Sequence, residues 1–273
     1  METKLNYKRT FLIGLAFLSI CSFWQMYDNI IPLILQNTYH LGETMTGAVM
    51  ALDNVLAIFL LPVFGALSDK VHTKLGRRMP FIVAGTILAV IFMMLLPMID
   101  NAEKARWNTG ESFSNQVIFL AVLFFTLVSM GLYRSPAVAL MPDVTPNHLR
   151  SRANAVINLM GAVGGVYALI MIKVLVGKGE TPDYLPLFAS IAAVMAIAVG
   201  ILVITIRENK LREEVEKAEA ANAGTIEEKA MAEGVEAAGE IEAVGDTGEV
   251  KSFDGKKQTG KTEGTKGMPK EVK

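Results

Sequence analysis

The sequence has too few cysteines for a disulfide-stabilised protein and no excess of positive charge that would indicate nucleic-acid binding. It has one cysteine, Cys21, among 273 residues, so no disulfide can form within the chain. The formal net charge is −1, and no bulk electrostatic attraction therefore points to a nucleic acid. Charged residues make up 19% of the chain and hydrophobic residues 52%, a balance too apolar for an ordinary soluble domain.

The first apolar run also lacks what a secretory signal peptide needs. It begins near Thr10, is longer than the apolar region of a signal, and is followed by no small-residue cleavage site. It also contains Trp24, Asp28 and Asn29, which do not suit such a segment. We therefore expect this run to stay in the protein as a helix.

Six apolar runs are each long enough to cross a lipid bilayer, which requires roughly 20 mostly apolar residues in a helix. They cover residues 10–35, 44–67, 80–99, 117–141, 153–176 and 184–206. We therefore predict an all-α membrane protein with a bundle of six transmembrane helices in residues 1–206. Residues 207–273 hold too few apolar residues to form a core, so we predict a charged, mostly disordered tail there.

Positive charge alternates between the segments that connect these runs. It gathers before the first run and after the second, fourth and sixth, where the cations are Lys4, Lys8, Arg9, Lys70, Lys74, Arg77, Arg78, Arg150, Arg152, Arg207, Lys210 and Arg212. The other three segments have few cations. Because positive loops stay in the cytoplasm, we predict a multi-pass protein of the cell membrane with both termini in the cytoplasm.

Two motifs lie in or beside segments predicted to be cytoplasmic. The first, after the second run, reads Gly65-Ala-Leu-Ser-Asp69-Lys70 and then Gly76-Arg77-Arg78-Met-Pro80-Phe81. The second reads Arg134-Ser-Pro136 through Met141-Pro142-Asp143, and then Leu149-Arg150-Ser-Arg152-Ala-Asn154. Together they resemble the major facilitator superfamily, whose signature loop is G-x-x-x-D-(R/K)…G-R-(R/K). The longer spacing resembles the sucrose-transporter and glycoside–pentoside–hexuronide branches. The resemblance covers residues 10–206 and implies the N-terminal six-helix half of a transporter with twelve helices.

The first motif also has a physical interpretation. A glycine lets neighbouring helices approach closely, and Arg77 and Arg78 can bind a carboxylate in bidentate geometry. The nearest candidate carboxylate is Asp143, at the inner end of the fourth run. The resemblance implies a gating signature that locks the outward-facing state, formed by Gly65, Asp69, Gly76, Arg77, Arg78 and Asp143. The alternative is a surface ion pair that only follows from topology.

Three charged residues lie inside the predicted membrane spans, namely Asp28, Asp53 and Arg134. A charge within a span is costly, so each is a functional candidate. Helix rise places Asp28 and Asp53 at a similar depth below the outer surface, and one of them is expected to carry a coupling proton. Interhelical polar contacts are the alternative for both carboxylates. For Arg134 the alternative is a structural pair with Asp143.

Neutral side chains near these charges are suited to a sugar. Amide groups can bond hydroxyls and an indole face can stack on a sugar ring, which makes candidates of Trp24, Gln25, Asn29 and Asn54. Sodium-coupled members of the glycoside branch carry an aspartate directly before the proline that lies in the second span. This chain has Leu61 before Pro62, so the resemblance favours proton coupling over sodium coupling.

The tail contains a pattern that satisfies the phosphate-loop motif, from Gly255 to Thr262. That loop works only between a buried strand and a helix, and the residues around it predict neither. We therefore expect no nucleotide to bind there.

Transport of a sugar or glycoside by proton symport is the predicted function. The expected partners are the lipid bilayer, a small solute and a proton, with no enzymatic activity, cofactor, metal or nucleic acid. Because a complete facilitator has twelve helices, three possibilities stay open. The chain is a truncated or split transporter, a half-transporter that pairs with itself or a second chain, or a membrane binding or assembly protein that transports nothing.

Overall fold

The computed structural model describes residues 5–107, 116–177, 182–220 and 224. Within these ranges the chain forms helices and no strand: α1 (Tyr7–Asn37), α2 (Glu43–Met50), α3 (Leu52–Lys70), α4 (Met79–Trp107), α5 (Gln116–Asp143), the short 3-10 helix η1 (Asn147–Leu149), α6 (Arg150–Leu175) and α7 (Leu185–Thr205). Residues 208–220 form a further short helix. The disordered tail was predicted for residues 207–273, and residues 208–220 differ from that prediction because they are helical. The remainder of the predicted tail from residue 225 onward, with the false phosphate loop, lies outside the described residues.

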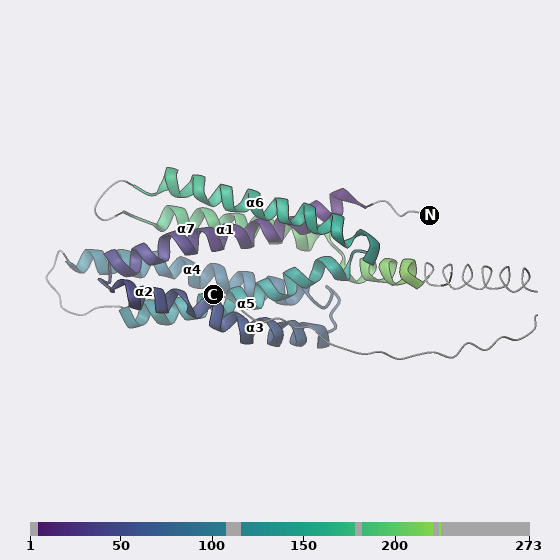
Figure 1. The fold of residues 1–273 in the computed structure, drawn as a ribbon, viewed down its shortest axis with the longest axis horizontal. Helices are drawn as coiled ribbons and strands as arrows, with labels where there is room; N and C mark the ends of the chain where they lie inside the picture. Colours follow the sequence, from purple (N-terminus) through teal and green to yellow (C-terminus); the bar gives the residue numbers. More distant parts are fainter. Residues whose placement is uncertain (1–4, 108–115, 178–181, 221–223, 225–273) are drawn as a thin grey trace, which may run out of the picture. The chain divides into compact units, whose positions relative to one another are not determined.

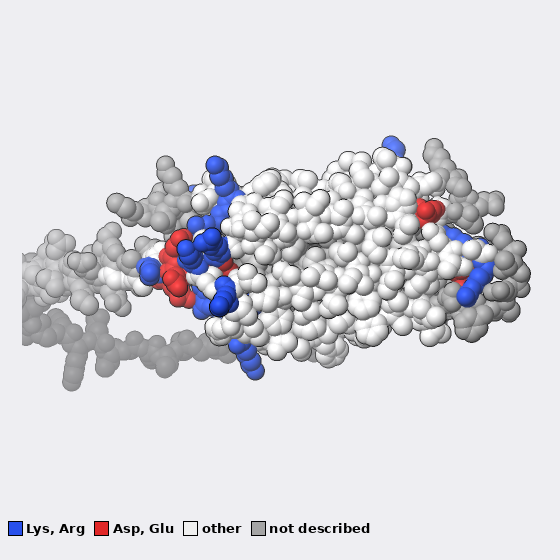
Figure 2. Space-filling model, turned by 180° about the vertical axis from the view of Figure 1, so that it is seen from behind, with Lys and Arg blue, Asp and Glu red and all other residues white. Residues whose placement is uncertain are grey.

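Six helical segments of the described chain are long and apolar enough to cross a membrane, with lengths from 21 to 31 residues. At 1.5 Å per residue, even the shortest reaches about 30 Å, the thickness of a hydrocarbon core. The predicted all-α fold with six transmembrane helices is therefore confirmed. On the face drawn in Figure 2, charged side chains gather at the two ends of the bundle and leave an uncharged belt between them.

The predicted second span is made of two helices, because the chain turns at Ala51 between α2 and α3. Asp53 lies in the first turn of α3, where the helix dipole favours a negative charge. Its carboxylate accepts the backbone N–H of Asn54 at 2.7 Å and the side-chain amide of Asn54 at 2.9 Å. Such local side-chain bonds compete with continuous helix, which is consistent with the interruption.

Two pairs of helices make the most extensive contacts, α1 with α6 and α4 with α5, and α7 packs against both α1 and α4 (Figure 1). In each of the two pairs, α1 with α6 and α4 with α5, a glycine lets the helices approach closely. A Cβ at Gly164 of α6 would overlap the carbonyl oxygen of Leu18 in α1, and a Cβ at Gly85 of α4 would lie 2.6 Å from the backbone nitrogen of Tyr133 in α5. The Ser22 hydroxyl joins the first pair by donating to the Gly164 carbonyl at 2.9 Å.

The spans differ greatly in how much they bury. The most apolar window of α1 is 56% buried within the chain, whereas that of the α2–α3 span is only 6% buried. α3 makes its main contacts with α5. It leaves a row of exposed apolar side chains, namely Val55, Ile58, Phe59, Val63 and Leu67. This row is called the α3 face below.

The helices alternate in direction, so their ends gather at two sites. One is the signature end, where α3 and α5 end and α4 and α6 begin. The other, the far end, carries the loop between α6 and α7. There the Lys104 ammonium binds the buried Asp100 carboxylate at 2.6 Å and the Pro182 carbonyl at 2.7 Å, and lies 4.6 Å from the centroid of the Tyr184 ring. Burial raises the pKa of the Tyr184 hydroxyl, and the Asp100 charge raises it further.

Candidate functional site

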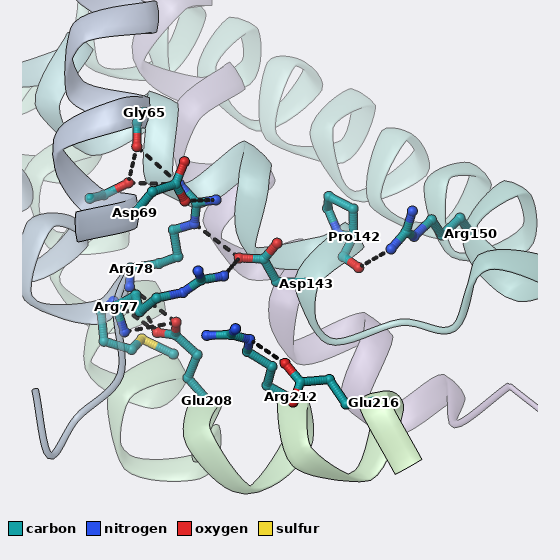
Figure 3. Close-up of polar contacts among 12 residues, drawn as sticks. Gly65, Asp69, Arg77, Arg78, Pro142, Asp143, Arg150, Glu208, Arg212 and Glu216 are labelled. Carbon is teal, nitrogen blue, oxygen red and sulfur yellow. Dashed lines mark hydrogen bonds and ion pairs between the residues drawn. The ribbon is translucent and has the colours of Figure 1, made fainter. Parts of the chain in front are cut away.

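The signature loop, residues 71–78, turns back on itself between α3 and α4. Gly76 has a φ of 123°, a left-handed conformation that residues with a Cβ rarely adopt. The Thr73 hydroxyl closes the turn by donating to the Gly76 carbonyl at 2.6 Å. The turn directs Arg77 and Arg78 back toward the ends of α3 and α5 (Figure 3).

Arg78 is the centre of a network that joins three helices. Its side chain is only 7% exposed, and it contacts Asp69 of α3 (Nη2 to Oδ1, 2.7 Å) and Asp143 of α5 (Nε to Oδ2, 3.0 Å). It also donates to the Ser68 hydroxyl at 2.7 Å. Arg77 reaches the same oxygen of Asp143 at 3.3 Å. The structure thus places both arginines against Asp143.

The six residues predicted as a gating signature all gather at this site. Gly65 contributes its carbonyl, which accepts from the Arg78 guanidinium at 3.4 Å and from the Ser68 hydroxyl at 2.8 Å. Its missing side chain also lets α5 approach, because a Cβ there would lie 3.3 Å from the Ser135 hydroxyl. Opposite charges from α3, α5 and the start of α4 therefore meet at this site.

Glu208 is a member of this network that sequence reasoning missed. It is 1% exposed, and its carboxylate accepts the backbone N–H groups of Arg77 (2.8 Å), Arg78 (3.0 and 3.1 Å) and Met79 (3.1 Å), as Figure 3 shows in part. These are the unpaired donors at the start of α4, where an anion is favoured. A Cβ at Gly76 would overlap the same carboxylate. Close contact with Glu208 is therefore a second reason, besides the positive φ, why this position requires glycine. The only signal in the sequence was a glutamate shortly after the sixth run.

Glu208 belongs to the helix of residues 208–220, which contacts three parts of the signature end. Asn209 donates to the carbonyls of Thr73 and Lys74, at 3.1 and 3.4 Å. Glu214 pairs with Arg9 at 3.2 Å. Glu219 accepts the backbone N–H of Asn147 at 3.1 Å. This helix is separate from the sixth span, because the chain is extended at Ile206 and α7 stops there.

A groove of about 400 Å³ lies in the membrane-spanning part of the bundle, between α1 and α6. Trp24, Gln25 and Asp28 line it from α1, and Asn158 lines it from α6 together with two glycines, Gly161 and Gly165. It is called the amide groove below. Asn158 was not predicted as a site residue. As an amide inside a predicted span, it was as strong a signal as Asn29 and Asn54, which were predicted.

A second, smaller pocket of about 20 Å³, enough for roughly one water, lies on the other side of Trp24. Asp53, Gly131 and Arg134 line it, and we call it the Arg134 pocket. The Arg134 guanidinium carbon lies 5.5 Å from the centroid of the Trp24 ring, within reach of a cation–π contact. The Trp24 indole N–H is buried and has no hydrogen-bond partner among the described residues. The alternative pairing of Arg134 with Asp143 does not occur, because Asp143 pairs with the signature arginines.

Two predicted site residues line neither space. Asn29 is exposed, and its amide donates to the Gln25 carbonyl one turn earlier at 2.7 Å. Asn54 is also exposed and bonds to Asp53. The structure therefore brings Trp24, Gln25 and Asp28 together around the amide groove, and Asp53 and Arg134 around the pocket beside it.

The fold and these motifs define a class of protein. The chain belongs to the major facilitator superfamily, because the model of that family matches residues 7–246. It is thus a multi-pass membrane protein, and the resemblance predicted from the signature loop is confirmed.

Sucrose transport proteins are among its relatives. Sucrose transport protein SUC4 of Arabidopsis thaliana is 35% identical over 116 residues, which make up 40% of this chain and 22% of that protein. Sucrose transport protein SUT3 of Oryza sativa subsp. japonica is 26% identical over 137 residues, or 47% of this chain and 27% of that protein. The matched regions thus span less than a third of the length of these relatives.

Proposed function

We propose that this chain forms one half of a proton-coupled membrane transporter for a sugar or glycoside. The amide groove carries this proposal, because it combines Asp28 with the amides of Gln25 and Asn158 within two membrane-spanning helices. Polar groups are costly at that depth, so a groove lined by them favours a solute pathway. Amides bond hydroxyl groups, and the Trp24 indole offers a stacking surface. The relatives that are named as sucrose transport proteins support a sugar as the solute.

The exposed α3 face is an argument for a second half of the transporter. Only 6% of the α2–α3 window is buried, compared with 28 to 56% for the other five spans. A second six-helix unit that packs on this face would bury it and would supply the opposite wall of the solute pathway. Another copy of this chain, or a separate chain, would be one source of such a unit.

The signature end is proposed to face the cytoplasm, since the cation-rich segments gather there. In this arrangement the contacts of Arg77 and Arg78 with Asp143 hold the inner ends of α3, α4 and α5 together. They would keep the outward-facing state closed on the inside and would separate when the transporter turns inward.

Uptake of radiolabelled sucrose into proteoliposomes tests the proposal. We expect uptake that increases when the proton gradient points inward, and we expect Asp28→Asn to lose that increase because its side chain cannot release a proton. Glu43→Gln is the matched control, since Glu43 is exposed at the start of α2 and lines neither space. Sucrose uptake that is equal with and without the gradient would exclude proton coupling.

Cross-linking in membranes tests the second half separately. In a Cys21→Ser background, Ile58→Cys on the α3 face should trap a partner chain. Ile197→Cys on α7 is the control and should trap none, although Ile197 is exposed as well, at 61%. The absence of any trapped partner at Ile58 would contradict a second half that is supplied by another chain.

A further inference from the structure

A second groove, apolar throughout, lies between α4 and α7 in the half of the bundle nearest the signature end. It has a volume of about 420 Å³, and its lining includes Val83, Ile87, Ile91, Val199, Gly200 and Ile204. From Val83 to Ile91 the helix rises about 12 Å. The one hydroxyl in the lining, that of Thr86, already donates to the Ile82 carbonyl at 2.7 Å. The groove therefore offers a ligand hydrocarbon contacts only.

A basic pocket of about 420 Å³ continues this groove toward the end of the bundle. The two spaces share Val203 and Ile204 in their linings. The pocket adds Lys74 from the signature loop with Arg207 and Lys210 from the segment after α7. All three cations are exposed, and none forms an ion pair with any residue in the described ranges.

The acidic residue in this lining does not neutralise the pocket by contact. Glu208 lines it as well, but the residue is 1% exposed and its carboxylate is occupied by the backbone N–H groups of Arg77, Arg78 and Met79. The three cations are thus left to a ligand. An apolar channel that opens into a cationic mouth at the end of a membrane bundle is complementary to a molecule with an acyl chain and an anionic head.

We propose that this composite groove is a binding site for an anionic phospholipid. One acyl chain would lie between α4 and α7 along Val83, Ile87 and Gly200, and the phosphate would contact Lys74, Arg207 and Lys210. Arginine and lysine are the usual phosphate partners in proteins. Basic pockets between transmembrane helices are also a known kind of lipid site. The site lies apart from the amide groove, so it does not depend on which solute is transported.

Native mass spectrometry of the purified full chain in detergent tests the site. Phosphatidylglycerol and phosphatidylcholine with the same acyl chains are added separately, and a dissociation constant is measured for each. We expect phosphatidylglycerol to bind more tightly. The triple variant Lys74→Gln, Arg207→Gln, Lys210→Gln should lose about fivefold in affinity for each cation removed and bind both lipids alike.

The matched control removes the same charge elsewhere. Lys8, Arg152 and Lys217 are exposed and line neither the groove nor the pocket. The variant Lys8→Gln, Arg152→Gln, Lys217→Gln should keep the preference for phosphatidylglycerol. Equal losses in the two triple variants, or equal binding of the two lipids by the unmodified chain, would overturn the proposal, because net charge or hydrocarbon alone would then explain binding.

Gly200→Leu tests the acyl-chain part of the site. A Cβ at Gly200 meets nothing within 4 Å, so the leucine can fill the groove without a clash. We expect it to weaken phosphatidylglycerol binding, whereas Gly47→Leu, at an equally open position of α2, should not. Inorganic phosphate should not displace the lipid. If Gly200→Leu has no effect, or if phosphate displaces the lipid, the site binds a phosphate group alone and the lipid assignment is wrong.

Discussion

The two ends of the bundle both hold buried charge, but they connect different things. At the signature end, Arg78 joins Asp69 and Asp143, which belong to other helices. At the far end, Asp100 and Lys104 lie four residues apart in the same helix, α4, and Lys104 also donates to the Pro182 carbonyl shortly before α7. The charged contacts of the signature end therefore connect different helices, whereas those of the far end connect α4 to the loop before α7.

The two kinds of contact respond differently to movement of the helices. A pair within one helix keeps its geometry however that helix moves, so the Asp100–Lys104 contact does not report on the positions of other spans. The contacts of Arg78 exist only while α3 and α5 stay beside the start of α4. The ion pairs of the signature end thus depend on how the helices of the bundle are arranged.

The largest effect is expected from Arg78→Gln. It removes the contacts with two carboxylates and leaves Asp143 with Arg77 alone. A hydrogen bond to a charged group contributes about 1.5–3 kcal/mol and two such contacts are lost, so the melting temperature in detergent should fall clearly. Arg152→Gln removes an exposed charge at the same end and should leave the melting temperature nearly unchanged. Equal melting temperatures for the two variants would mean that the network does not hold the helices together.

A smaller effect is expected from Glu208→Gln. The amide keeps an acceptor oxygen but loses the charge, and hydrogen bonds to a charged group contribute about 1.5–3 kcal/mol. Hydrogen exchange at the amides of Arg77, Arg78 and Met79 should become faster by about tenfold or more. In contrast, Glu214→Gln removes only the largely exposed pair with Arg9, worth about 0.2–1 kcal/mol, and should not change exchange at those three amides. Unchanged exchange in Glu208→Gln would show that its carboxylate does not hold the loop.

The smallest effect is expected from exposed asparagine side chains at the two ends. Asn101→Ala removes the bond to the Asp183 carboxylate at the far end (2.7 Å), and Asn209→Ala removes the bonds to the carbonyls of Thr73 and Lys74 at the signature end (3.1 and 3.4 Å). Each should lower the free energy of unfolding by about 0.5–1.5 kcal/mol, because the donors are neutral amides and the contacts are exposed to water. A much larger loss at one end, measured by thermal unfolding of both variants, would show that the ends differ in more than their charged networks.

Hydropathy and one motif predicted much of this arrangement. Long apolar runs must form helices in a bilayer, and the placement of Asp143 beside Arg77 and Arg78 followed from the ends of the second and fourth runs. Depth along a helix was predictable for Asp28 and Asn29, but rotation about its axis was not. Adjacent residues point about 100° apart, so Asp28 lines the amide groove while Asn29 does not.

Contacts that join distant parts of the chain were beyond prediction from local patterns. Glu208 bonds to residues 129 to 131 positions earlier, and no local pattern signals such a return. Asn158 was missed because the position of a single amide along the fifth run does not show which way its side chain points. The interruption at Ala51 was not predicted, because no proline lies there. Asp53 and Asn54, which follow it directly, were the one local signal.

The cap that Glu208 provides also sets an order on biosynthesis. The first turn of α4 is made early, yet the carboxylate that satisfies its N–H groups is synthesised only about 130 residues later. Until then the donors at Arg77, Arg78 and Met79 must be satisfied by water at the membrane surface. The start of α4 therefore reaches its final state only after α7 has entered the membrane and the chain has returned to the signature end. The loop between the second and third spans can thus be completed only after the sixth span is in place.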